Sequence, residues 1–143
     1  MGAYVFSNFW GGRNMSNGKD LKHILKRVYN HESLAGIDLR NLYFSCMDFS
    51  GLELRTANLE GCCLSHALLD DCDLTGANLA NAKLTHASLH RAKLTGAILT
   101  NVVVNGASFE GVTGLTPATK AYLKSKGATG LDEDATMAEA EAG

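Results

Sequence analysis

Large apolar residues recur at every fifth position of the chain from residue 34 to residue 109. They form an unbroken central column: Leu34, Leu39, Phe44, Phe49, Leu54, Leu59, Leu64, Leu69, Leu74, Leu79, Leu84, Leu89, Leu94, Leu99, Val104 and Phe109. Two positions before each central residue lies a second column, which holds mostly Ala or Cys from position 57 onward. Two positions after each central residue, the chain favours Gly, Asn, Asp or His.

A period of five fits neither an α-helix, whose period is 3.6, nor a β-strand, whose period is two. It predicts short extended segments joined by tight turns, at which Gly and Asn tolerate a positive φ angle. Because one such unit cannot bury its apolar face alone, stacked units share a continuous core. We therefore predict an all-β solenoid whose structural core is the central column.

Three segments carry a recognisable motif: Ala57-Asn58-Leu59, Cys72-Asp73-Leu74 and Ala77-Asn78-Leu79. They resemble the pentapeptide-repeat family, whose motif reads A(D/N)LXX, and the resemblance spans residues 32–111. It implies a right-handed quadrilateral β-helix with four pentapeptides in each coil, and thus about four coils over residues 32–113. Residues twenty positions apart are then expected to lie above one another.

The two ends of the chain depart from the repeat. Residues 1–15 form an aromatic arm, and residues 16–31 are predicted to be a helix that caps the bulky first coil. A second helix is expected at residues 114–127, and residues 128–143 form an acidic tail without a basic residue. We expect the apolar face of the first helix to pack near the first coil, through Leu21, Ile24, Leu25 and Val28.

The composition excludes several classes of protein. The net charge of −2 provides no basic field for nucleic acid or anionic lipid. The four cysteines lack a disulfide or zinc spacing and favour a reducing cytoplasm, or a virion if the chain is phage-encoded. No secretory signal and no apolar stretch long enough to span a membrane is present.

Two sets of residues were weighed for chemistry. Cys46, His66 and His86 fall on equivalent corners of successive coils, where metal ligands can converge, but a fourth ligand is missing. Ser65 and Ser88 lie near histidines, but a flat-sided rod offers no pocket for a catalytic triad. We predict no metal, no cofactor and no enzymatic activity.

The function expected from the sequence is that of a rigid, non-enzymatic scaffold for protein partners, as a homo-oligomer or in a larger assembly such as a virion. Candidate partner-binding residues are those of the aromatic arm and an acidic edge: Tyr4, Phe6, Phe9, Trp10, Glu53, Asp70, Asp71 and Asp73. The arm can either anchor to a partner or fold back on its own rod. The alternative function, which the family resemblance implies, is a DNA mimic that protects DNA gyrase from quinolones.

Overall fold

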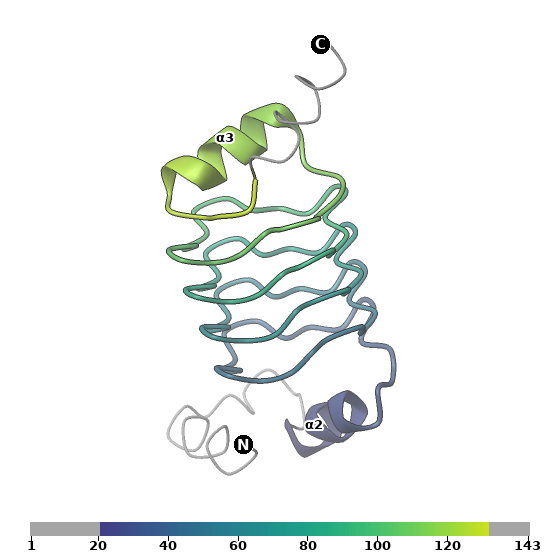
Figure 1. Cartoon of the computed structure of the whole chain (residues 1–143). Helices are drawn as coiled ribbons and strands as arrows, with labels where there is room; N and C mark the ends of the chain where they lie inside the picture. The colour runs from purple at the N-terminus through teal and green to yellow at the C-terminus, as the bar shows by residue number, and fades with distance from the viewer. Residues whose placement is uncertain (1–20, 132–143) are drawn as a thin grey trace.

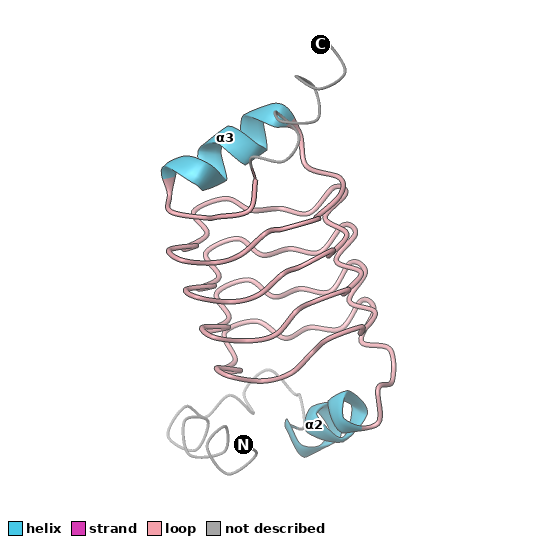
Figure 2. Cartoon of the chain, in the orientation of Figure 1, coloured by secondary structure: helices cyan, strands magenta, loops and turns pink. Residues whose placement is uncertain are grey.

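The structure, a computed structural model, describes residues 21–131. These residues form a solenoid with helix α2 (Leu21–Tyr29) at one end and helix α3 (Pro117–Ser125) at the other (Figure 1). Each pentapeptide contributes a single bridge residue to its ladder, so the coils are drawn as loops and turns (Figure 2). The predicted arm, residues 1–15, and most of the acidic tail lie outside the described residues.

Four parallel ladders run along the solenoid, and we call them faces A to D. Face A is formed by Glu53, Asp73, Lys93 and Thr113. Face B is formed by Asp38, Asn58, Asn78 and Ile98. Face C is formed by Tyr43, Cys63, Lys83 and Val103. Face D is formed by Asp48, Leu68, Ser88, Ser108 and Thr129. The residues of faces A, B and C are spaced by twenty, so one coil takes twenty residues, as the quadrilateral β-helix requires.

The hydrogen bonds repeat from coil to coil because the backbone repeats. Leu79 N donates to Ile98 O at 2.8 Å, and Ile98 N donates to Ala77 O at 2.9 Å. Ala82 N closes the turn by donating to Leu79 O at 3.0 Å. The residue that follows each central position by two has a positive φ angle, for example 62° at Asn81. The preference for Gly and Asn at that position therefore follows from the left-handed corner.

The interior is filled by the two inward columns. Every residue of the central column is buried, and the most exposed of them, Leu99, exposes only 8% of its surface. In the first coil the central column contains Phe44 and Phe49, whose rings meet edge to face with centroids 5.3 Å apart. The second column is bulky in this coil, and its residues Ile37 and Met47 are half-buried. From Ala57 onward small residues let the coils stack closely around the central side chains.

Helix α2 packs its apolar stripe onto the first coil. Leu21, Ile24 and Val28 are buried in the common core and Leu25 is partly buried. The spacing of three and four residues places these side chains on one helix face. The helix begins no later than the first described residue and ends at Tyr29, two residues before the predicted limit. The Arg27 guanidinium donates a hydrogen bond to Ser33 O and ties the helix to the first coil.

Helix α3 is shorter than the segment predicted for it. The Thr116 side chain caps it by accepting a hydrogen bond from Thr119 N at 3.1 Å, and Pro117 fits the first turn. The chain then returns to face D, where Phe109 N donates to Thr129 O at 2.9 Å. Residues 128–131 therefore belong to the solenoid and not to a tail, since Ala128 and Leu131 are buried against it.

Candidate interaction surface

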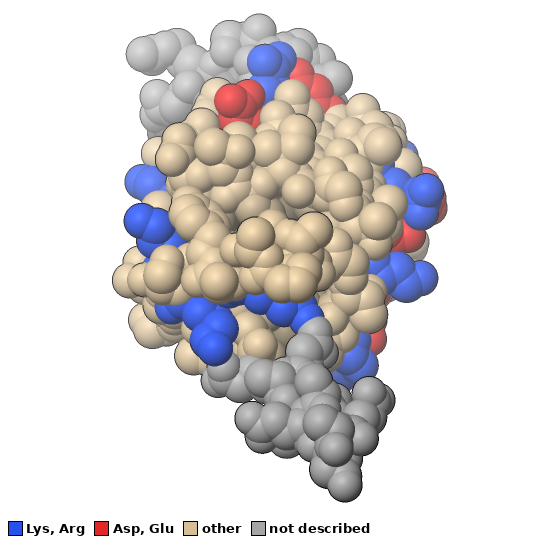
Figure 3. All heavy atoms as spheres, turned by 90° about the horizontal axis from the view of Figure 1, so that it is seen from above, with Lys and Arg blue, Asp and Glu red and all other residues tan. Residues whose placement is uncertain are grey.

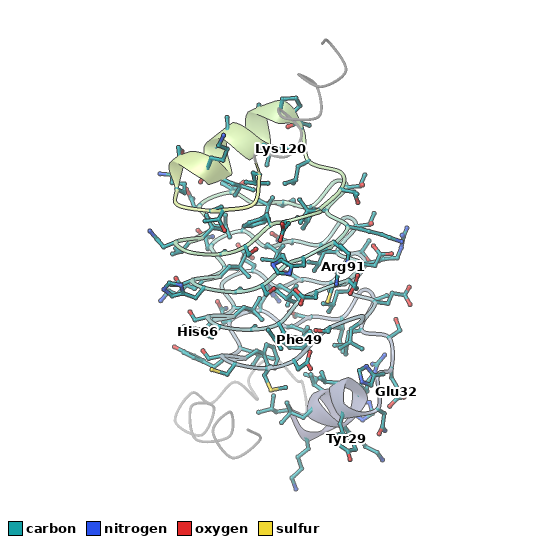
Figure 4. All side chains as sticks on the ribbon, viewed as in Figure 1. Tyr29, Glu32, Phe49, His66, Arg91 and Lys120 are labelled. Carbon is teal, nitrogen blue, oxygen red and sulfur yellow. The ribbon has the colours of Figure 1, made fainter. Side chains whose placement is uncertain are left out.

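The predicted acidic edge lies where face D meets face A, and two of its four carboxylates, those of Asp71 and Asp73, pair with arginines. Asp71 accepts two hydrogen bonds from Arg91, at 2.8 Å from Nε and 2.9 Å from Nη2 (Figure 4 labels Arg91). These bonds hold the pKa of the Asp71 carboxyl below its ordinary value. Asp73 accepts from Thr75 Oγ1 at 2.6 Å and from Arg55 at 3.2 Å, and the Thr75 bond contributes most to its lowered pKa. The two arginines therefore pair with two of the four carboxylates of this edge.

Asp70 takes part in side-chain bonds that run up face D. Its Oδ1 accepts from Ser88 Oγ at 2.6 Å and from the His90 backbone N–H at 3.0 Å. One coil higher, His90 Nε2 and Ser108 Oγ lie 2.7 Å apart. This spacing suits a nucleophile and its base, but the pair lies on a flat ladder and lines neither hollow described below. The bonds cross-link successive rungs.

Cys46, His66 and His86 lie at the corners of successive coils, as predicted, but they do not form a metal site. The His66 and His86 rings stack, with centroids 5.2 Å apart and planes inclined by 24° (Figure 4 labels His66). The next corner is Gly106, where a Cβ would lie 2.4 Å from His86 Nδ1, so a larger residue there would displace the His86 ring. Within residues 21–131, no group of three or more His, Cys, Asp or Glu side chains is arranged to hold a metal ion.

The four cysteines are free thiols in three environments, since Cys46 is exposed, Cys63 is half-buried, and Cys62 and Cys72 are buried. Cys62 and Cys72 lie in the inward column, and burial raises the pKa of each thiol to about 12. Cys63 lies half-buried on face C beside Ser45, with Sγ and Oγ 3.2 Å apart. Although partial burial raises the pKa of Cys63, hydrogen bonds with Ser45 and Ser65 outweigh it, and the net pKa is lowered.

Two open hollows lie between the last coil and α3, and Tyr122 lines both of them. The Val103 hollow, of about 550 Å³, is lined by residues 101–105 together with Tyr122, Ser125, Lys126 and Gly127. The Leu99 hollow, of about 450 Å³, is lined by Ala97, Leu99, Thr100, Asn101, Ala118, Thr119 and Tyr122. Seen from this end, the middle of the surface carries no charged side chain, and both basic and acidic side chains lie at its rim (Figure 3).

The floor of both hollows is an open β edge. Faces A and D gain a further rung at Thr113 and Thr129, whereas faces B and C stop at Ile98 and Val103. Within residues 21–131, no backbone partner exists for five groups that every lower coil pairs: the N–H groups of Leu99, Asn101 and Val104 and the carbonyls of Ala97 and Val102. We call these groups the C-terminal edge.

Exposed apolar side chains accompany this edge. Ile98 and Val103 are 46% and 38% exposed, and both belong to the last rung of their faces. None of these residues is among the partner-binding candidates predicted from the sequence, which lie in the arm and on the acidic edge. The available signal was the end of the repeat: the central column stops at Phe109 on face D, and Gly114 stands where the next large residue would fall.

The five-residue corners, the four ladders and the two inward columns define the class of the protein, a pentapeptide β-helix. The family model described as pentapeptide repeats (8 copies) matches the chain twice, over residues 33–71 and 72–111, which is more than half of the 143-residue chain. The chain belongs to the pentapeptide-repeat family, which confirms the resemblance of its sequence.

Solved structures of this family are similar to the chain. A pentapeptide repeat protein from the thylakoid lumen of Arabidopsis thaliana is 31% identical over 65% of this chain and 74% of that chain, with a TM-score of 0.55. A pentapeptide repeat protein from Nostoc is 23% identical over 74% of this chain and 92% of that one, with a TM-score of 0.44. QnrB1, a plasmid-mediated fluoroquinolone resistance protein, is 23% identical over 57% of this chain and 48% of its own, with a TM-score of 0.26.

The last two likenesses concern the fold and carry no argument about function. No curated protein sequence matches the chain. Neither of the two helices in the described part of the chain is long and apolar enough to cross a membrane.

Proposed function

We propose that this protein is a non-enzymatic scaffold that binds other protein chains at the α3 end of its rod. The observation that carries the proposal is the coincidence, at one end, of an unpaired β edge, two open hollows and the exposed side chains of Ile98 and Val103. An extended segment of a partner can pair with such an edge through its backbone and fill pockets with alternate side chains.

The chemistry of that partner segment follows from the lining of the hollows. It is extended, apolar or β-branched above Ile98 and Val103, and uncharged in its middle, because the centre of this end carries no charge (Figure 3). Tyr122 lines both hollows and adds aromatic surface to them, and the Lys126 ammonium lies 5.7 Å from the centre of its ring. Lys126 lines the Val103 hollow and favours an acidic residue at one end of the segment.

The rod that carries this edge has four coils, in our proposal, and its ends are closed by α2 and α3. The apolar residues of α2 and Leu123 of α3 are buried in the same core as the central column. Repeat rods need such ends, because an open end exposes apolar core and unpaired backbone. The four free thiols fit a reducing compartment, with the cytoplasm as our proposed location.

We propose no catalytic role for any residue, since the His90 and Ser108 pair lies outside both hollows. The DNA-mimic alternative requires an extended acidic surface. Along the acidic edge such a surface is interrupted by two arginines, because Asp71 pairs with Arg91 and Asp73 with Arg55. No feature of the described residues favours this alternative, and it serves as an outcome of the test below.

The test compares three forms of the full chain as bait in affinity capture from the native source. Ile98→Lys with Val103→Lys places charges beside the C-terminal edge and is expected to lose the captured partner. Leu68→Lys is the matched control. Leu68 is 42% exposed and occupies on face D the same outward position that Ile98 and Val103 occupy on faces B and C, but its backbone is covered by the next rung at Ser88. Equal capture by all three forms contradicts the proposal. Inhibition of gyrase supercoiling by the wild-type chain supports the alternative.

A further inference from the structure

The C-terminal edge is bounded on both sides by rungs that the chain itself supplies. On face A, Thr113 N donates to Ala92 O at 3.1 Å and forms a rung above Lys93. At the far end of face C, Gly106 N donates to Gly127 O at 3.0 Å, where the chain returns after α3. Within the described residues, the last coil therefore has rungs on faces A and D but none on faces B and C.

A corner divides this edge into two halves. Asn101 ends face B with a φ angle of 57°, and the equivalent corner one coil lower, Asn81, has a φ angle of 62°. The Leu99 hollow lies along face B and the Val103 hollow along face C, and Asn101 and Tyr122 line both. A straight strand can therefore pair with one half only, whereas an occupant of both halves has to bend above Asn101.

The open backbone groups have the pattern that a further rung of the same solenoid would fill. Between the last two rungs of face B, Ile98 N donates to Ala77 O at 2.9 Å, and Ile98 O accepts from Leu79 N at 2.8 Å. Thr100 O then accepts from the corner residue, Asn81 N, at 2.9 Å. The C-terminal edge offers the same three groups again on face B, and the first two of them on face C.

We propose that the partner bound at this edge contributes a bent segment that completes the last coil. The segment runs parallel to the rungs, lies along face B, turns above Asn101 and continues along face C. Its turn residue is Gly or Asn, because the corner requires a positive φ angle, which these residues adopt most readily. This inference rests on the proposed function and adds to it the direction, the shape and the turn residue of the partner segment.

The two hollows specify the side chains of the segment. Central residues of successive rungs point inward and are five positions apart, so one central side chain enters the Leu99 hollow and the next enters the Val103 hollow. Leu99 lines the first hollow, and Val102 and Val104 line the second, so both of these side chains are apolar. A parallel segment ends above face C, where the positive charge of Lys126 favours an acidic residue at its carboxyl end.

The experiment measures the binding of three fluorescent peptides to the full chain by fluorescence anisotropy. The probe peptide reads Ala-Thr-Leu-Thr-Asn-Ala-Thr-Leu-Thr-Asp, which places Asn at the turn and Asp beside Lys126. The second peptide has Gly in place of the turn Asn and is expected to bind with a similar affinity. The third has Val at the turn and is expected to bind on the order of tenfold more weakly, because a β-branched residue is strained at a positive φ angle.

Amide hydrogen exchange followed by NMR shows which part of the edge the probe peptide covers. With the probe peptide in excess, the N–H groups of Leu99, Asn101 and Val104 are all expected to become protected, because a bent segment accepts a hydrogen bond from each. The amides of Cys63 and Leu68 are the control. Both are bonded within the described rod, so their exchange is expected to stay unchanged.

Three results would overturn the inference. Equal affinity of the Asn and Val peptides would show that the turn needs no positive φ angle. Protection of fewer than all three edge amides would show that the segment does not follow both faces, and the absence of binding by any peptide also rejects it. The proposed function fails on a different result, namely equal capture of the partner by the wild-type chain and by the form with Ile98→Lys and Val103→Lys.

Discussion

Replacing Leu79 by aspartate places a carboxylate in the middle of the solenoid. Leu79 is fully buried in the common core, and its backbone N–H donates to Ile98 O at 2.8 Å. The side chain cannot turn outward without breaking this rung, because inward and outward positions alternate along it. The new carboxylate therefore has neither water nor a basic partner in the core.

Leu79→Asp lowers the free energy of unfolding through two contributions. Truncating a buried leucine costs about 2–5 kcal/mol, through lost burial and the cavity left behind. An unpaired buried charge costs several kcal/mol more. Because small domains are stable by about 5–15 kcal/mol, the sum consumes most or all of the stability. We expect Leu79→Asp to be unfolded, or to melt far below the wild-type chain.

Thermal unfolding followed by circular dichroism measures this effect. Leu68→Asp is the control, since Leu68 is a 42% exposed leucine on the outward column of face D. Substitutions at such surface positions usually change stability by no more than about 0.5 kcal/mol. A Leu79→Asp melting temperature equal to that of the wild-type chain would refute the inward assignment of the central column.

Three further predictions address other parts of the rod. Deleting residues 1–31 exposes apolar core and strand edges, so the truncated chain is expected to aggregate, which light scattering measures. A soluble truncated chain that is as stable as the full chain would show that α2 is not a cap. Thiol labelling at neutral pH is expected to modify Cys46 and Cys63 rapidly. Cys62 and Cys72 are expected to react only after unfolding, because burial raises the pKa of both thiols to about 12. Equal labelling rates at all four cysteines would contradict the assignment of Cys62 and Cys72 to the core. Arg91→Gln is expected to raise the pKa of Asp71, measured by NMR titration. Because the pKa of Asp71 is lower in the folded chain than in the unfolded chain, the pair contributes stability above the unfolded pKa of about 3.9. That stability is lost as the pH falls through the folded pKa. An Asp71 titration that Arg91→Gln leaves unchanged would argue against the pair.

The repeat made most of the fold predictable. Its period of five places Leu79 and its equivalents inside and puts Asn81 at a corner with a positive φ angle. The register of twenty also contained the Asp71 and Arg91 pair, because these residues are twenty positions apart at the corner between faces D and A. That pairing weakens the acidic edge as a partner site, and it could have been anticipated from the sequence alone.

The ends of the rod could not be predicted in the same way. Thr129 joins face D twenty-one residues after Ser108, across an intervening helix, so counting in fives does not find it. The C-terminal edge arises because α3 takes the place of two rungs, which is a property of tertiary packing and not of the motif. At Gly130 the returning chain packs closely against the last coil, since a Cβ there would lie 2.7 Å from Glu110 N.

Site-specific photo-cross-linking tests the claim of a partner at the C-terminal edge most directly. A photoreactive amino acid is placed at position 103 or, as the control, at position 68, and the full chain is irradiated in its native cells. Our account predicts a protein adduct of defined mass from position 103 and none of that mass from position 68. The same adduct from both positions, or from position 68 alone, would contradict it.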